Sequence, residues 1–348
     1  MTASVQRLQR PTNRHHPIIA NTRLCLAMKY TRALRSLMVL NAAILLCCVA
    51  GAQVSSTSHN NTNDEYTLKL NADIVILSAT VLDHHNALVS GLGKDDFHVY
   101  ENGVLQQIKH FTHEDIPVTV GILVDNSGSM KPKRDDVINA ALTFAGSSNP
   151  QDQMFVVNFG DHVSFGLPAD TPFTDRRDKL QLALSEIKTI GQTSLYDGIA
   201  VGLDHLKLGN RDKKVLIVIS DGGDNVSRHS LAQVVAMAKQ SAAIIYAIGI
   251  YDVGDGDQNP VVLGRFARET GGLAFFPESS RDIPSICEQI ARDIRNQYTL
   301  AYTPTVAAQD GSYRTIAVKA GAPGRGRLTV RTRPGYFVSS VPSPLAVR

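Results

Sequence analysis

The chain has 348 residues, of which 43% are hydrophobic and 19% are charged. This length and composition are typical of a folded globular protein with room for two domains. The formal net charge is only +3, and much of that excess comes from residues 1–35, which contain no acidic residue. The rest of the chain therefore lacks the basic surface expected of a nucleic-acid-binding protein.

The N-terminal part has the pattern of an export signal. Residues 37–52 (LMVLNAAILLCCVAGA) form a short apolar run that ends in Ala50-Gly51-Ala52, the small-residue cleavage site of a secretory signal peptide. The run is shorter than the about 20 residues that span a membrane. The basic stretch that starts at Met28 suits the segment before such a run. We therefore expect translation to start at Met28 and residues 1–52 to be an N-terminal extension and signal peptide.

This interpretation predicts a protein of the periplasm, the cell envelope or the exterior, without a stable transmembrane helix in the mature chain. A lipoprotein is the weaker alternative, because the stretch 44–47 only weakly resembles a lipoprotein cleavage box and bulky Leu46 stands just before Cys47. Three of the four cysteines lie in the part expected to be removed, and only Cys287 remains. The mature protein therefore has no internal disulfide, and packing must stabilise it.

A polar linker (53–64) is followed by a β-rich segment, 65–117. Apolar residues alternate at period two through Ile74 and Ile76, which predicts a half-buried strand. The segments FHVYE and VLQQIKHF flank Asn102-Gly103, a strong signal for a β-hairpin. After residue 297, a second β-rich segment (298–340) and a short tail (341–348) follow, with a glycine-rich hairpin loop expected at 321–326.

Between these segments, residues 118–297 alternate strands with amphipathic helices. The predicted strands are apolar throughout and cover 118–124, 154–159, 214–220, 243–250 and 273–277. Such strands, separated by helices, indicate an α/β domain with a mostly parallel central sheet covered on both faces. The last helix places Cys287 in an apolar row, as an inert core thiol. The flanking β segments predict a small β-sandwich-like domain into which the α/β domain is inserted.

Oxygen-bearing side chains follow three of the predicted elements. Asp125, Ser127 and Ser129 come directly after the strand 118–124, Thr193 opens a helix, and Asp221 ends the strand 214–220. These positions belong to the carboxyl edge of the sheet, where ligand sites of open α/β folds form. Mg²⁺ prefers six oxygen ligands. A polar turn that caps a helix would explain the first group alone, but the two distant companions favour a metal site.

This pattern resembles the metal-ion-dependent adhesion site of von Willebrand factor A domains. The motif Asp125-Asn126-Ser127-Gly128-Ser129, with Thr193 and Asp221 downstream, carries the resemblance over roughly 118–297. Segments such as GQTSLYDGI and NQYTLAYTP are similar to the exported family of related proteins in acidobacteria. The resemblance implies a Rossmann-like domain that binds Mg²⁺ or Mn²⁺ and completes its coordination with an acidic residue of a protein partner.

Other acidic residues are candidates for a rim that contacts a partner. They are Asp224, Asp252, Asp255 and Asp257. The alternative is a solvated turn for Asp224 and a plain acidic loop for the others. An EF-hand is excluded, because Phe266 stands where that loop needs glutamate. Ser194 and Asp197 match a helix capping box.

Three classes of function remain to be weighed. The first is an exported, metal-dependent protein-binding module of adhesion type. The second is a structural component of a cell-envelope assembly, in which the metal only stabilises the loops. The third and most remote is a metallohydrolase, which would need a general base beside a metal-bound water. No nucleophile elbow, phosphate-binding loop or dinucleotide motif occurs, so we expect no enzymatic activity.

Overall fold

The computed structural model describes residues 74–185, 191–251, 258–306 and 311–338. All of these residues belong to one compact unit, Lys69–Arg348. Within these ranges, no helix combines the length and the apolar character needed to cross a membrane.

The α/β domain is built on a six-stranded sheet with the order β10-β9-β8-β5-β6-β7. Five of its strands are parallel, as the sequence predicts, and the apolar residues of β5, β6, β8 and β9 are buried. The sixth, β7, is a short antiparallel edge strand that the sequence pattern did not predict. The strands are β5 (Val118–Asp125), β6 (Gln153–Phe159), β7 (Val163–Phe165), β8 (Lys213–Ser220), β9 (Ile244–Gly249) and β10 (Ala274–Phe275).

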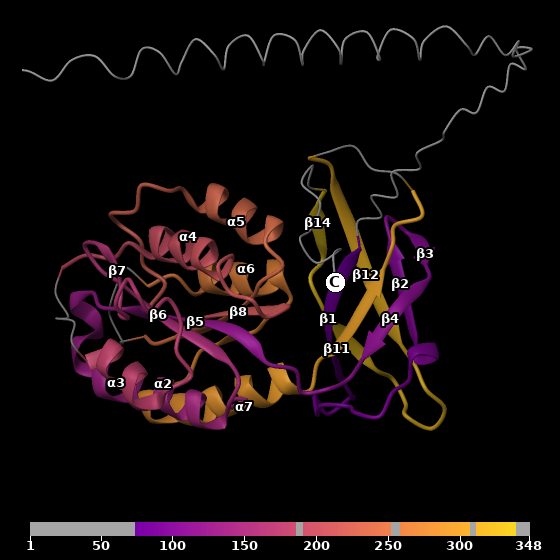
Figure 1. The fold of residues 1–348 in the computed structure, drawn as a ribbon, viewed down its shortest axis with the longest axis horizontal. Helices are drawn as coiled ribbons and strands as arrows, with labels where there is room; N and C mark the ends of the chain where they lie inside the picture. Colours follow the sequence, from indigo (N-terminus) through magenta and orange to yellow (C-terminus); the bar gives the residue numbers. More distant parts are fainter. Residues whose placement is uncertain (1–73, 186–190, 252–257, 307–310, 339–348) are drawn as a thin grey trace, which may run out of the picture. The chain divides into compact units, whose positions relative to one another are not determined.

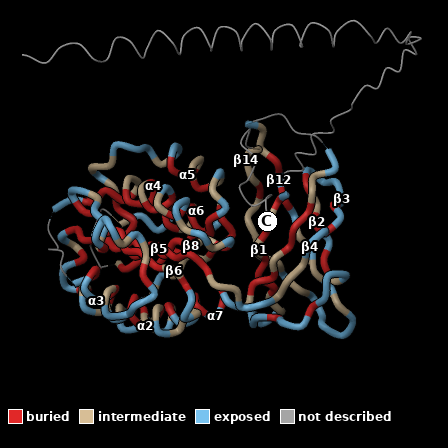
Figure 2. Tube along the Cα trace, in the orientation of Figure 1, coloured by how far each residue is buried: buried red, intermediate tan, exposed pale blue. Residues whose placement is uncertain are grey.

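Helices cover both faces of this sheet (Figure 1). One face carries α2 (Arg134–Ser147), α3 (Arg177–Ser185) and α7 (Ile283–Arg295), and the other carries α4 (Leu195–Leu206), α5 (Leu231–Gln240) and α6 (Pro260–Thr270). Figure 2 shows β5, β6 and β8 buried between these layers. Every residue of β5 is buried. Gly121 lies at its centre because a Cβ there would fall 2.4 Å from Cζ of Phe155.

The β-rich segments form two four-stranded sheets, each of which combines strands from before and after the α/β domain. Their residues share one apolar core that includes Leu77, Val99 and Leu300. The predicted fold class is therefore confirmed. One sheet contains β13 (Thr329–Arg331), β1 (Val75–Leu82), β11 (Tyr298–Tyr302) and β4 (Ile108–Thr112), and the other contains β14 (Gly335–Phe337), β12 (Tyr313–Ala320), β2 (Phe97–Glu101) and β3 (Val104–Gln106).

The predicted hairpin at Asn102-Gly103 is present, and both residues have positive φ, as a tight two-residue turn requires. Its second strand was predicted as one element, which is wrong. It divides into β3, which pairs with β2, and β4, which pairs with β11 in the other sheet. The chain therefore changes sheets at Gln107, and a single strand could not supply hydrogen bonds to both.

Two further predictions about the β segments were wrong. The buried face of β1 carries Val75 and Leu77, whereas Ile74, just before the strand, is 50% exposed, and the start of the predicted alternation (66–72) lies outside the described residues. Apolar residues occur at both parities around this point, so periodicity could not choose the face. The glycine-rich stretch 321–326 is not a hairpin loop, because it joins β12 to β13, and β13 pairs with β1 in the other sheet.

A buried carboxylate ties the last turn of α7 to the β sheets. Asp293 is 5% exposed and accepts hydrogen bonds from Thr80 Oγ1 at 3.0 Å and from the Tyr246 hydroxyl at 2.7 Å. It also forms an ion pair with Arg331. On the same helix, Cys287 is buried, and burial raises the pKa of its thiol to about 12. The prediction of an inert core thiol agrees with this environment.

Candidate metal-binding site

The first loop of the site begins where β5 ends. Asp125 is the last residue of the strand, and a 3-10 helix, Gly128–Lys133, follows within three residues. The carboxylate of Asp125 accepts the backbone N–H of Ser127 at 2.8 Å on Oδ1 and the hydroxyl of Ser220 at 2.6 Å on Oδ2. Oγ of Ser127 lies 3.2 Å from Oγ of Ser129. The two hydroxyls are therefore side by side, next to a buried carboxylate.

The third loop meets the first directly. Asp221 follows the last residue of β8, and its Oδ2 accepts the hydroxyl of Ser129 at 2.7 Å. Its Oδ1 accepts the backbone N–H of Gly223 at 3.1 Å. Gly222 has a φ of +82°, a conformation that glycine adopts without strain. Parallel strands β5 and β8 are neighbours in the sheet, which brings the two loops together at one edge.

The second loop contacts both of the others. Gly191 accepts the backbone N–H of Gly128 at 3.1 Å, which connects it to the first loop. Asn225 of the third loop holds Thr193 from two sides. Its Oδ1 accepts the N–H of Thr193 at 2.8 Å, and its N–H donates to the Thr193 carbonyl at 3.0 Å. The three loops thus form a closed triangle of hydrogen bonds.

Gly191 is required at its place in this triangle. Its φ is +89°, and an added Cβ would fall 2.1 Å from Oδ2 of Asp161. Asp161 in turn accepts the backbone N–H of Gln192 at 2.7 Å. Only glycine lets the chain pass this carboxylate and still reach Gly128.

The electrostatics of the site leave it short of positive charge. Burial raises the pKa of Asp125 to about 6, hydrogen bonds from Ser127 and Ser220 oppose that rise, and the nearby charge of Asp221 adds to it. In the part of the chain that the structure describes, no basic side chain forms an ion pair with either carboxylate. The hydroxyl of Thr193 is also without a hydrogen-bond partner among those residues, although Thr193 is only 6% exposed.

The residues present fit a hard divalent cation. Two carboxylates and three hydroxyls are oxygen donors of the kind that Mg²⁺ and Mn²⁺ prefer. Among the described residues, no three His, Cys, Asp or Glu side chains gather as a metal cluster. The donor set is therefore one in which neutral hydroxyls outnumber the carboxylates.

The family model for the von Willebrand factor type A domain matches residues 119–289. This segment is a von Willebrand factor type A (VWA) domain. Such domains are protein-interaction modules that commonly bind a divalent metal. No curated protein matches the chain. The further likeness to exported acidobacterial proteins remains a prediction.

Solved structures similar to this chain include three from different organisms. One is a von Willebrand factor type A protein from Catenulispora acidiphila, with 13% identity, a TM-score of 0.48 and coverage of 70% of this chain and 74% of that chain. The second is the vWF domain of the type V pili tip protein Mfa5 from Porphyromonas gingivalis. Its identity is 13% and its TM-score 0.44, and the match covers 53% of this chain and 96% of that chain. The third is the manganese-loaded TRAP protein from Plasmodium vivax. Its identity is 14% and its TM-score 0.40, and the match covers 67% of this chain and 96% of that chain.

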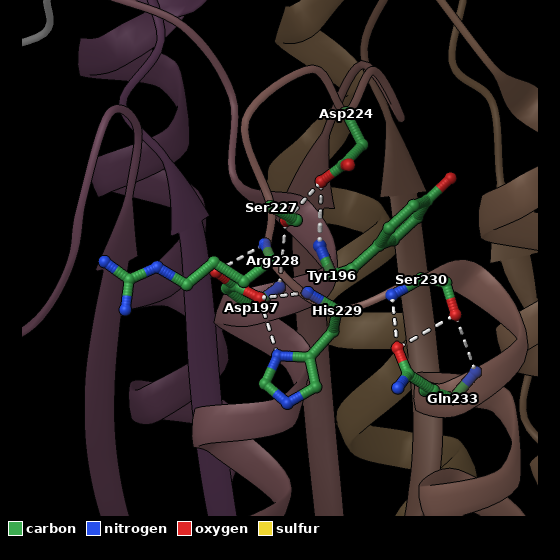
Figure 3. Close-up of polar contacts among 8 residues, drawn as sticks. All are labelled: Tyr196, Asp197, Asp224, Ser227, Arg228, His229, Ser230 and Gln233. Atoms are coloured by element: carbon green, nitrogen blue, oxygen red, sulfur yellow. Dashed lines mark hydrogen bonds and ion pairs between the residues drawn. The ribbon is translucent and has the colours of Figure 1, made fainter.

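The third loop of the VWA domain also caps helix α4 (Figure 3). Oδ1 of Asp224 accepts the N–H of Tyr196 at 3.1 Å, and Oγ of Ser227 accepts the N–H of Asp197 at 3.1 Å. The predicted capping box of Ser194 and Asp197 was therefore wrong. Ser194 makes no side-chain cap, and its buried hydroxyl has no hydrogen-bond partner in the described part of the chain. The first turn of α4 already has its acceptors from another loop.

Asp197 is used instead to hold the end of the same loop. Its carboxylate accepts the backbone N–H groups of Arg228 and His229, each at 3.0 Å. Nδ1 of His229 lies 2.6 Å from Oδ1 of Asp197 (Figure 3). The loop that carries Asp221 is therefore fixed to the helix that follows Thr193 at both of its ends.

The predicted ligands of the VWA domain thus lie on three loops that contact one another. Of the predicted rim, Asp224 is half-buried and occupied with the cap of α4, while Asp252, Asp255 and Asp257 lie outside the described residues. Sequence reasoning missed two supporting residues, Ser220 and Asn225. No local pattern could have found Asn225, because its role depends on a residue 32 positions away.

Proposed function

We propose that this chain is an exported, metal-dependent protein-binding module. In this proposal its VWA domain holds Mg²⁺ or Mn²⁺ with Asp125, Ser127, Ser129, Thr193 and Asp221. The observation that carries the proposal is the pair of carboxylates that have no basic partner among the described residues, set among hydroxyls on three loops that contact one another. Export rests on the signal-peptide pattern of residues 28–52.

The donor types suggest what such a site recognises. When bound, the ion supplies a positive charge that attracts an anionic group. Three of the five proposed ligands, Ser127, Ser129 and Thr193, are neutral, so the ion keeps more of its charge than it would among carboxylates alone. An acidic side chain of a protein partner is therefore the guest that this site favours.

The closed hydrogen-bond triangle favours binding over the structural alternative, in which the ion merely stabilises the loops of an envelope component. The loops already hold one another through the protein groups of Gly128, Thr193 and Asp221. An ion is then not needed to hold the three loops together. A hydrolase is less well supported, because His229 is the only histidine on the three loops among the described residues, and its Nδ1 is occupied by Asp197.

Metal binding is tested by titrating Mn²⁺ into the purified protein and following the loss of free-ion signal by electron paramagnetic resonance. The wild-type protein should bind one ion. Ser129→Ala should weaken binding at least about tenfold, since even indirect partners of a metal are worth about 10- to 100-fold. Ser164→Ala is the matched control, because Ser164 is exposed on β7. Equal binding by all three proteins would remove the metal from the proposal.

Partner binding is tested by capture from cell-envelope extract on immobilised protein, read by mass spectrometry. A specific partner should be lost with EDTA, return with Mn²⁺, and be absent from folded Asp125→Ala. An acidic-to-amide substitution in the contacting segment of that partner should then abolish binding. Capture that survives both EDTA and Asp125→Ala would support the structural alternative instead. N-terminal sequencing of the native protein tests export, and a mature chain that retains residues 28–52 would contradict it.

A further inference from the structure

Arg134 lies at the base of the first loop of the proposed metal site. It is the first residue of α2 and directly follows the 3-10 helix of that loop. Its Nη1 donates to Oδ1 of Asn126 at 2.7 Å, across eight positions of the chain. Asn126 stands between the proposed ligands Asp125 and Ser127. The hydrogen bond from Arg134 therefore closes the loop that carries the hydroxyls of Ser127 and Ser129.

The second arm of the Arg134 guanidinium holds the end of α3, which is a neighbour of α2 on one face of the sheet (Figure 1). Nη2 of Arg134 donates to the carbonyls of Leu184 and Ser185, at 3.0 Å and 3.3 Å. These two residues end α3, and the carbonyls at a helix C-terminus have no partner inside the helix. A cation also suits the negative end of the helix dipole. Arg134 thus caps α3 at the point from which the chain continues to the second loop.

Two buried asparagines connect the same elements. Nδ2 of Asn126 donates to Oδ1 of Asn158 at 2.8 Å, and Nδ2 of Asn158 donates to the carbonyl of Ala183 at 3.4 Å. Asn126 is 5% exposed and Asn158 is 1% exposed. Because a guanidinium can only donate hydrogen bonds, Arg134 requires the oxygen of the Asn126 amide on its side. That choice turns the amide nitrogen toward Asn158, so Arg134 orients both asparagines.

Asn126 is held through its main chain as well as its side chain. Its backbone N–H donates to the carbonyl of Phe159, the last residue of β6, at 2.7 Å. The amide is fixed by Arg134 and Asn158. The peptide units that join Asn126 to the two neighbouring ligands therefore have little freedom to move.

We propose that Arg134 is a positioning residue of the metal site and sets how strictly the site selects Mg²⁺ over Ca²⁺. Through Asn126 it keeps the oxygens of Ser127 and Ser129 at a fixed separation. Mg²⁺ demands near-ideal octahedral geometry at about 2.1 Å, whereas Ca²⁺ accepts six to eight oxygens in flexible arrangements at about 2.3–2.6 Å. A rigid first loop favours the small ion, and a loosened loop relaxes that preference. This inference rests on the proposed function, because it concerns the same site.

The test extends the Mn²⁺ titration to competition by Mg²⁺ and by Ca²⁺, each followed on the full chain by the release of free Mn²⁺ in electron paramagnetic resonance. Arg134→Met should bind Mn²⁺ about tenfold more weakly than wild type, as expected when an indirect partner of a metal is lost. It should also lower the ratio of Mg²⁺ to Ca²⁺ affinity at least about fivefold. A purely structural loss would weaken the binding of all three ions alike and leave this ratio unchanged.

Two further variants and a control locate the effect. Asn126→Ala should lower the affinity and the ratio in the same direction. The double variant of Arg134→Met and Asn126→Ala should lose no more than the larger single loss, because the two residues act in one chain of contacts. Arg211→Met is the matched control, since Nη2 of Arg211 also donates to a carbonyl, that of Gln151 at 2.9 Å, but before the start of β8 and not at the metal-binding edge. It should leave both quantities within about twofold of wild type.

The outcomes separate this inference from the proposed function. An unchanged ratio in folded Arg134→Met, full additivity in the double variant, or an equal change in Arg211→Met would overturn the role of Arg134 and leave the metal site intact. If Arg134→Met does not fold, the ratio measured for Asn126→Ala decides. A wild-type protein that binds no Mn²⁺ would overturn the metal site and this inference together.

Discussion

Replacement of Lys213 by methionine should make the protein more stable at pH 7. Burial lowers the pKa of Lys213 from its ordinary value of 10.5 to about 8, although Asp115, Asp293 and Asp152 oppose that change. Each tenfold change in an acid dissociation constant corresponds to about 1.4 kcal/mol. The charge on Lys213 therefore destabilises the folded protein by about 3 kcal/mol at neutral pH.

The net gain in Lys213→Met is smaller than this. The substitution removes the hydrogen bond to the carbonyl of Ile294, and an unpaired buried carbonyl costs about 1 kcal/mol or more. Methionine keeps most of the apolar stem, so little packing is lost. We expect the free energy of unfolding at pH 7 to rise by about 1–2 kcal/mol.

The sign of the pH dependence follows from linkage. The pKa of Lys213 is lower in the folded protein than in the unfolded chain, so between pH 8 and about 10.5 the unfolded chain binds more protons. Stability contributed by this residue must therefore rise with pH across that window, and the full cost is present below pH 8. The difference in stability between Lys213→Met and wild type should shrink toward zero, and then change sign, as pH approaches 10.5.

The assay is equilibrium unfolding in urea, followed by circular dichroism, at pH 7, 8, 9 and 10. Lys214→Met is the matched control, because Lys214 is the next residue of β8, is only half-buried and points to the opposite face. Its substitution should change stability by less at every pH. A Lys213→Met protein less stable than wild type at pH 7, or a difference that does not depend on pH, would refute the reasoning.

Three further predictions concern the site and the core. Asn225→Ala should weaken Mn²⁺ binding about tenfold, because the backbone N–H of Thr193 loses the hydrogen bond to Oδ1 of Asn225. Unchanged affinity in the Mn²⁺ titration would contradict this. Gly121→Ala should cost about 1–3 kcal/mol in urea unfolding, because its Cβ would overlap the ring of Phe155, and a neutral effect would mean that the ring can move. Asp293→Ala should cost about 3 kcal/mol by leaving the partly buried Arg331 without its ion-pair partner, whereas a loss below about 1 kcal/mol would show that the ion pair is not needed.

The proposed metal site could be predicted from the sequence because its ligands stand at recognisable local positions. Asp125 ends one apolar strand, Asp221 directly follows another, and Thr193 stands two residues before a helix. Parallel strands carry such positions to one edge of the sheet by their direction alone. The hairpin at Asn102-Gly103 was predictable for a similar reason, since its turn depends on two adjacent residues.

The capping of α4 and the buried face of β1 were decided only by the tertiary structure. The sequence pattern predicted that Ser194 caps α4, but Asp224 and Ser227 from another loop accept the N–H groups of its first turn. Periodicity reports how a segment alternates, but not which distant segment covers it, because that depends on the pairing of strands such as β1 with β11 and β13. The sequence by itself thus determined most of the elements and the sheet edge where the proposed ligands gather, and the packing of those elements decided which loop caps α4 and which face of β1 is buried.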